Sequence, residues 1–156
     1  MVVEILQITS PAVATDIHKL QMEAYTREAR LIEYPDIPPL RETIQEIKGF
    51  PGIVYGIYGE HHQKLLGVIF IERFEDGNEH AATIVKLIVD GKYSRKGIGR
   101  ALVKYVQTKY NTLYVSTSKR NAPAIRLYEN AGFIIQSQKV IDKQLTLCMF
   151  KWENFF

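Results

Sequence analysis

The chain has 156 residues, of which 46% are hydrophobic and 24% charged, an ordinary composition for a soluble globular protein with one core, and we predict a single domain over residues 1–156. It has no apolar run of membrane-spanning length, no basic segment before an apolar start, and a single cysteine, Cys148. These features argue against a membrane protein, a secreted protein and a disulfide framework, and they predict a cytoplasmic location. The four histidines are scattered, so we predict no metal site.

The net charge of +3 hides an uneven distribution. Residues 1–85 carry 7 Lys or Arg against 13 Asp or Glu, whereas residues 86–126 carry 10 against 1. The basic stretch suits an anionic ligand, and the acidic front half would favour a cationic acceptor such as an amine.

The first half of the chain reads as a strand, two helices and two strands. Ser10 and Pro11 form a cap and a first-turn proline, which predict a helix that continues to about Arg30. Three prolines between positions 31 and 39 indicate a linker. The elements predicted here are a strand at 3–8, helices at 11–30 and 40–48, and strands at 53–60 and 65–73 that form a hairpin.

The second half continues through a turn at 75–78. We predict a central strand that ends at Val89, a helix after Gly99, a strand at 112–117, a helix after Asn121, and a last hairpin of strands at 133–138 and 145–152. The predicted order is β-α-α-β-β-β-α-β-α-β-β. We therefore expect an α/β (α+β) fold with a mixed, mostly antiparallel sheet and helices on both faces.

A basic, glycine-bearing loop joins the central strand to the next helix. Its sequence is Arg95-Lys96-Gly97-Ile98-Gly99-Arg100. A helix N-terminus offers free backbone N–H groups and a positive dipole end, which favours a phosphate ligand. The spacing fits neither a Walker loop nor a Rossmann fingerprint, because Leu102 stands where the third Rossmann glycine would be.

A second motif follows in residues 121–133, NAPAIRLYENAGF. Asn121 is a good N-cap, Pro123 lies in the first helical turn, and Gly132 is a stop signal before a strand.

Together, the two segments resemble motifs A and B of the GNAT superfamily of acetyl-CoA-dependent N-acetyltransferases. The pattern Arg/Gln-x-x-Gly-x-Gly/Ala departs at its first position, which is Ser94, with Arg95 one residue late. The resemblance implies that acetyl-CoA is the co-substrate. It places the pantetheine arm against the backbone of Leu87, Ile88 and Val89 and against Asn121, and the pyrophosphate on the backbone of Arg95, Lys96, Gly97, Ile98, Gly99 and Arg100.

The resemblance also implies a catalytic residue, because Tyr128 occupies the family's position for the proton donor to the leaving thiolate and for a cofactor contact. The central strand offers Lys86 in place of the glutamate that many relatives use as a base, and Ser116 occupies the alternative position on the next strand. Glu72 is our candidate base, directly or through a water chain. By resemblance, the first two helices and their connection lie over the acceptor, so Glu28, Glu33 and Tyr34 are candidate substrate contacts.

We expect direct transfer of the acetyl group to a primary amine, on a small molecule or a peptide, in a ternary complex. The alternative is a non-catalytic acyl-CoA-binding regulatory module of the same fold. A nucleic-acid binder is a weaker alternative, because the basic residues cluster at one loop and no aromatic platform accompanies them. We expect neither a nucleic-acid nor a membrane partner, and we leave open whether the chain forms a homodimer.

Overall fold

The computed structural model describes residues 1–74, 80–93 and 95–154. The turn that we predicted at 75–78 lies outside these residues.

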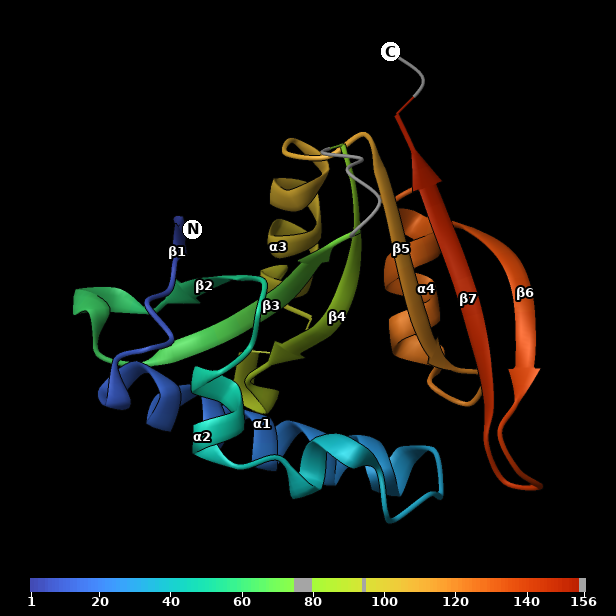
Figure 1. The fold of residues 1–156 in the computed structure, drawn as a ribbon, viewed down its shortest axis with the longest axis horizontal. Helices are drawn as coiled ribbons and strands as arrows, with labels where there is room; N and C mark the ends of the chain where they lie inside the picture. The colour runs from blue at the N-terminus through green and yellow to red at the C-terminus, as the bar shows by residue number, and fades with distance from the viewer. Residues whose placement is uncertain (75–79, 94, 155–156) are drawn as a thin grey trace.

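In the described residues, seven strands form one sheet in the order β1-β2-β3-β4-β5-β7-β6 (Figure 1). β4 and β5 are parallel and the other neighbours are antiparallel, which confirms the mixed, mostly antiparallel sheet. The strands are β1 (Val3–Ile5), β2 (Ile53–Tyr58), β3 (Leu65–Arg73), β4 (Ala81–Val89), β5 (Thr112–Ser118), β6 (Ile134–Val140) and β7 (Thr146–Glu153).

Helices lie on both faces of the sheet, as predicted. The α-helices of the described residues are α1 (Pro11–Leu31), α2 (Ile44–Lys48), α3 (Ile98–Gln107) and α4 (Ala122–Asn130). Short 3₁₀ turns, η1 (Pro38–Arg41), η2 (Glu60–His62) and η3 (Gly91–Tyr93), occupy three of the connections. Figure 1 shows α1 and α2 together along one side of the molecule, away from α3 and α4.

The second helix begins four residues later than we predicted. Pro38 and Pro39 lie in η1, and α2 starts after Thr43. The hydroxyl of Thr43 accepts from the backbone N–H of Glu46, and the Glu46 carboxylate accepts from the N–H of Thr43. This capping box fixes the start of α2 at Ile44.

Two apolar cores result from the alternation of side chains along the strands. On one face, Val68, Phe70 and Ile88 pack with α1 and α2. On the other face, Ile69 and Ile84 pack with α3 and with residues of α4. The central strands are therefore covered on both sides.

β4 and β5 pair only over the first part of their length. Their ladder runs from the Ala81–Thr112 pair to the Ile84–Val115 pair, although β4 continues to Val89. Figure 1 shows the two strands separating beyond this point. The separation agrees with the splay that the resemblance implied.

A β-bulge coincides with the start of the splay. Phe70 pairs with Lys86 while Ile71 pairs with Ile84, so Val85 is an extra residue on β4. A bulge bends its strand and increases the local twist. Val85 therefore turns β4 away from β5 directly after their last pair.

None of the helices in the described ranges is both long and apolar enough to cross a membrane.

Candidate functional site

The turn after β4 positions the basic loop. Asp90 is buried, and its carboxylate accepts from the backbone N–H of Lys92 at 2.9 Å and pairs with Lys64 Nζ at 3.0 Å. These contacts fix the chain where it leaves the sheet, so the loop begins from a rigid point.

The loop has the geometry of an anion site. Arg95 and Gly97 both have a positive φ, 65° and 84°, and α3 begins at Ile98. Residues in alternating left- and right-handed conformations make concavities lined by N–H groups, and the first N–H groups of a helix have no helical acceptor. The predicted phosphate loop therefore has suitable backbone geometry, and its Arg95, Lys96 and Arg100 side chains are exposed. Ser94, the departure from the motif, lies outside the described residues.

Gly99 is a glycine for a different reason from Gly97. A Cβ at Gly99 would lie 3.3 Å from Leu127 Cδ2 and 3.6 Å from Val89 Cγ2. The missing side chain lets α3 approach α4 and β4 closely. The side chain of Ile98 is buried in the core, so this residue can meet an anion only through its backbone.

The free edge of β4 faces the splay. The N–H of Asp90 donates to the carbonyl of Leu66, so in an antiparallel ladder the backbone groups of Val89 and Leu87 point away from β3. Both can therefore pair with an extended ligand. The backbone of Ile88 points toward β3 by the same alternation, and its side chain is buried on the α1 face, so Ile88 does not face the splay.

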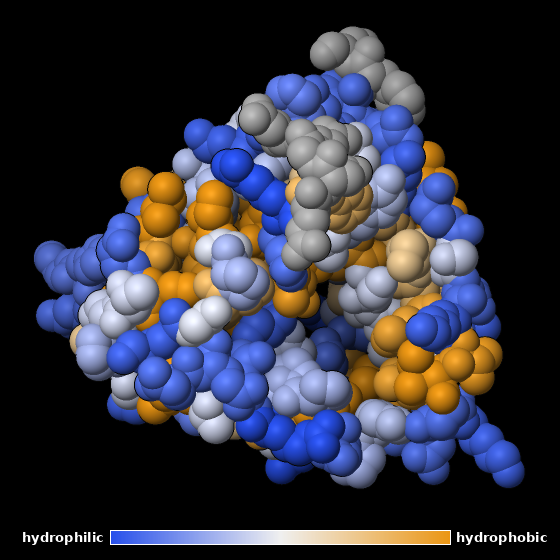
Figure 2. Space-filling view, in the orientation of Figure 1, coloured by the Kyte–Doolittle hydropathy of each residue, from blue (hydrophilic) through white to orange (hydrophobic). Residues whose placement is uncertain are grey.

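The last turns of α1 bridge the two sides of the splay (Figure 1). Arg27 Nη2 donates to the carbonyl of Val89 at 2.9 Å, and Glu28 Oε1 accepts from Asn121 Nδ2 at 2.7 Å. Consecutive residues of one helix thus contact the end of β4 and the start of α4. The surface of this face is hollowed near its centre, over the region where β4 and β5 separate (Figure 2).

Asn121 has two structural contacts in addition to any contact with a ligand. Its Oδ1 accepts from the N–H of Ala124 at 3.2 Å, which caps α4, while its Nδ2 holds Glu28. The predicted N-cap is confirmed, and the contact with Glu28 is a finding that the sequence did not indicate.

The acid–base properties of this centre follow from burial. Burial raises the pKa of Tyr128 well above its usual value near 10, and the nearby Glu28 carboxylate raises it further. Burial also raises the pKa of Glu28, against the hydrogen bond from Asn121. Tyr25 belongs to the same group of interacting side chains. Burial raises the pKa of Tyr25, and the nearby Glu28 and Tyr128 raise it further.

Glu33 and Tyr34 lie at the outer end of the α1–α2 connection. Glu33 has a positive φ, its side chain is 79% exposed, and it pairs with Arg120 at 3.4 Å. The Tyr34 hydroxyl donates to Asp142 Oδ2 at 2.8 Å, so the connection contacts the turn between β6 and β7. These contacts tie the α1–α2 connection to the residue before Asn121 and to the β6–β7 turn.

Glu72, our predicted base, lies far from this centre. It is exposed and pairs with Thr83, before the splay begins. The Gly67–Val89 pair is five residues away along β3, which is about 17 Å of strand. The structure therefore does not bring Glu72 together with Tyr128 and Asn121.

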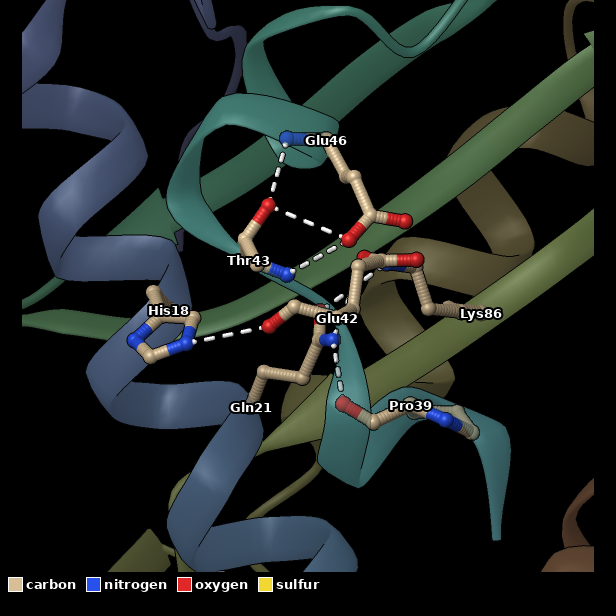
Figure 3. Close-up of polar contacts among 7 residues, drawn as sticks. All are labelled: His18, Gln21, Pro39, Glu42, Thr43, Glu46 and Lys86. Atoms are coloured by element: carbon tan, nitrogen blue, oxygen red, sulfur yellow. Dashed lines mark hydrogen bonds and ion pairs between the residues drawn. The ribbon is translucent and has the colours of Figure 1, made fainter.

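A buried lysine faces the α1 side of β4 (Figure 3). The Nζ atom of Lys86 donates to Gln21 Oε1 at 2.9 Å, forms an ion pair with Glu42 Oε1 and lies 4.0 Å from the centre of the Phe70 ring. Burial lowers the pKa of Lys86, and the Glu42 carboxylate opposes that effect. The connection between α1 and α2 thus places the Glu42 carboxylate against β4, a strand that contains no Asp or Glu.

Further hydrogen bonds hold Glu42 in place. Gln21 Nε2 donates to Glu42 Oε1 at 3.1 Å and to the carbonyl of Pro39 at 3.0 Å. A ring nitrogen of His18 lies 3.1 Å from the Glu42 carbonyl oxygen. Glu42 could not be identified from the sequence, because 44 residues separate it from Lys86 and no local pattern joins them.

The described part of the chain contains no group of three or more His, Cys, Asp or Glu residues placed to hold a metal ion.

Comparison with known proteins supports the motif assignment. Residues 14–133 match the model of the Acetyltransferase (GNAT) family. The chain is 35% identical over 134 residues to the UPF0157 protein YqkA of Bacillus subtilis, covering 84% of this chain and 37% of that protein. It is 34% identical over 94 residues to the peptidyl-lysine N-acetyltransferase YiaC of Escherichia coli, covering 60% of each. The matches thus span only about a third to three fifths of these relatives.

The fold matches solved structures over almost the whole chain. One is yncA of Salmonella typhimurium with its cofactor acetyl-CoA, with a TM-score of 0.69, 16% identity and coverage of 97% of this chain and 92% of that one. At this identity the likeness concerns the fold.

The Lys86–Glu42 ion pair predicts that removing the carboxylate lowers the free energy of unfolding more than removing the lysine charge does. Glu42→Ala leaves a buried ammonium without its carboxylate and should lower the free energy of unfolding by about 3 kcal/mol, the low end for breaking a buried pair because Glu42 is partly exposed. Lys86→Met removes the buried charge, keeps the contact with Phe70 and should cost about 1 kcal/mol or less. Urea unfolding measures both.

Lys19→Met, on the exposed face of α1, is the control and should change stability by less than about 0.5 kcal/mol. A Glu42→Ala variant no less stable than Lys86→Met would contradict the role of the pair.

Proposed function

The chain belongs to the GNAT family of acetyltransferases, and from this premise we propose that it transfers the acetyl group of acetyl-CoA to a primary amine by direct attack. The observation that carries the proposal is the splay between β4 and β5, with the basic loop at one end and Tyr128, Asn121 and Glu28 beside it. A cytoplasmic location remains part of the proposal.

The binding of acetyl-CoA would use backbone groups. The N–H groups at Gly97, Ile98 and Gly99 would hold the pyrophosphate, assisted by the exposed Arg95, Lys96 and Arg100. The free edge groups of Leu87 and Val89 would pair with the amides of the pantetheine arm, as in strand addition. The Val89 carbonyl has two lone pairs, so it can accept from a ligand as well as from Arg27.

Tyr128 would protonate the leaving sulfur. Its raised pKa keeps the phenol protonated throughout the neutral range, so the donor is always available. The same shift makes it a weaker acid than the thiol it would protonate, which has a pKa of about 8.5. We therefore expect the proton to move as the carbon–sulfur bond breaks, with Tyr128 then reprotonated from the nitrogen of the new amide or from solvent.

The acceptor would be a cationic amine before reaction. Three carboxylates, Glu28, Glu33 and Glu42, lie on α1 and its connection to α2. YiaC, a relative, is named for action on peptidyl-lysine, so a lysine peptide is a suitable first acceptor.

The test of the function is a thiol-release assay with acetyl-CoA and a panel of amines that includes a blocked lysine peptide, polyamines, amino acids and aminoglycosides. Acetylated amine identified by mass spectrometry supports transfer. Binding of acetyl-CoA without transfer to any member would favour the non-catalytic module, and failure to bind acetyl-CoA would reject both.

Gly97→Ala should weaken the binding of acetyl-CoA. The added Cβ has room, since its nearest neighbour is Met1 Cε at 3.6 Å, but the φ of 84° is unfavourable for alanine by about 1 kcal/mol. Relaxation of the loop would misalign a charge-assisted hydrogen bond and raise the dissociation constant about tenfold in calorimetry.

Gly49→Ala is the matched control, because Gly49 has a φ of −88° and its new Cβ would lie 3.6 Å from the Gln45 carbonyl oxygen. Equal affinity in the Gly97→Ala and Gly49→Ala variants would place the pyrophosphate elsewhere.

Tyr128→Phe should lower turnover by about 10² to 10⁴, the usual contribution of a general acid, while acetyl-CoA affinity changes little. The ring remains, so its contact with Phe133, at 5.4 Å between centroids, should survive. Tyr110→Phe, another buried tyrosine of the same core, should leave turnover unchanged. Turnover retained by Tyr128→Phe would leave solvent as the proton source.

Cys148→Ala should keep most of the turnover. Cys148 is buried in β7 and packs in the apolar core, so the substitution leaves a small cavity and removes no reacting group. An acetylated Cys148 peptide recovered by mass spectrometry during turnover would replace direct attack with an acyl-enzyme.

A further inference from the structure

We infer that Glu28 is the general base that removes the proton from the acceptor ammonium. This inference rests on the proposed acetyl transfer and assigns a catalytic role to a residue that the sequence indicated only as a substrate contact. Its basis is the location of Glu28 across the splay, where the Asn121 amide orients its carboxylate beside Tyr128.

The position of Glu28 follows from contacts on both sides of the splay. Arg27 binds the Val89 carbonyl at the end of β4, and the next residue, Glu28, binds Asn121 just beyond β5. Four residues further along, the Arg120 guanidinium donates to the carbonyl of Ile32 at 3.1 Å and holds the end of α1 in place. The helix therefore holds the Glu28 carboxylate over the opening in which a thioester would be presented.

Comparison of the three acceptor-side carboxylates favours Glu28. Glu42 is neutralised by the buried Lys86, and Glu33 is largely exposed and pairs with Arg120. Among the described residues, no Lys, Arg or His forms an ion pair with Glu28, whose hydrogen-bond partner is the neutral amide of Asn121. Glu42 and Glu33 are thus held by cations, whereas the Glu28 carboxylate is held by an amide.

Burial also changes the pKa of Glu28. The pKa of Glu28 is raised by burial, which brings this carboxylate nearer to the neutral range in which a base works best. The titratable groups that interact with it are Tyr25 on α1 and Tyr128 on α4, and both phenols have raised pKa values. Glu28 is therefore the member of this trio that can accept a proton at neutral pH.

The proton balance is complete with these residues. The Glu28 carboxylate takes a proton from R–NH₃⁺, and the lone pair of R–NH₂ forms the carbon–nitrogen bond at the thioester carbonyl. The carbon–sulfur bond then breaks, and the sulfur takes a proton from Tyr128. The second nitrogen proton restores Tyr128, and Glu28 releases its proton to solvent, which leaves the amide, the free thiol and one proton.

The test compares two acceptors that differ in basicity. The primary amine that the wild type acetylates fastest is paired with its alkoxyamine analogue, which is neutral at pH 7 and needs no base before attack. Glu28→Gln should lower kcat/KM for the primary amine by about 10² to 10⁴. The loss in kcat/KM for the alkoxyamine should be smaller than this loss by a factor of about 10². Glutamine keeps an oxygen that can accept from Asn121, so the geometry should be retained.

Glu23→Gln is the matched control, because Glu23 is an exposed glutamate on the same helix. It should leave kcat/KM unchanged for both acceptors. Calorimetry should give the same acetyl-CoA affinity for Glu28→Gln as for the wild type, since Glu28 lies on the acceptor side.

The thermal stability of Glu28→Gln gives an independent check on folding. Because burial raises the pKa of Glu28, the stability it contributes is present in acid and is lost as the pH rises through the folded-state pKa. At pH 7 the variant should therefore melt at or above the temperature of the wild type.

Glu28→Asp, which keeps the charge, should retain more activity on the primary amine than Glu28→Gln.

The outcomes separate this inference from the proposed function. Equal losses on the amine and the alkoxyamine, or no loss on either, would overturn the role of Glu28 while leaving acetyl transfer in place. A wild-type protein that acetylates no amine would overturn both.

Discussion

The separation of β4 from β5 is the constraint on which the site depends. Backbone N–H and carbonyl groups inside a protein must have partners, and a sheet that opens in its middle leaves some without one. The ladder stops at the Ile84–Val115 pair, and the bulge at Val85 turns β4 aside at that point. The edge of β4 beyond it can therefore bind a ligand that carries its own amides.

A helix supplies a hydrogen bond to part of the open edge of β4, and the other backbone groups of that edge can bind a ligand. Arg27 donates to the Val89 carbonyl, and α3 begins beside β4 and close to α4, where a Cβ at position 99 would lie 3.3 Å from Leu127 Cδ2. One distortion of the sheet thus accounts for both parts of the proposed acetyl-CoA site, the open edge of β4 and the loop at its end.

Local sequence patterns predicted most of the elements because each depends on neighbours in the chain. Gly97 needs its positive φ, and Asn121 caps the helix that follows it, so both roles were visible in their own segments. The later start of α2 shows the limit of this reasoning, because a proline-rich stretch fits either a helix start or a 3₁₀ turn.

The acid–base groups could not be predicted in the same way. Glu28 meets Asn121 across 93 residues, and Glu42 meets Lys86 across 44, and no periodicity connects either pair. Glu72 was a reasonable candidate from strand position alone, but the antiparallel register places it at the opposite end of β3 from Gly67. Register and helix docking decide these contacts, and both are tertiary properties.

Glu28 and Glu42 also show how the chain can do without a carboxylate on the central strand, where Lys86 is buried. Lys86 faces α1 and holds Glu42, which fixes the connection between the helices against the sheet. An ion pair of this kind fixes geometry at little gain in stability, and it holds the Glu42 carboxylate against a cation. The base that we infer therefore has to be a carboxylate with a neutral partner. Glu28 meets that requirement because α1, held in part by the Glu42–Lys86–Gln21 contacts, crosses the splay with Asn121 as its partner.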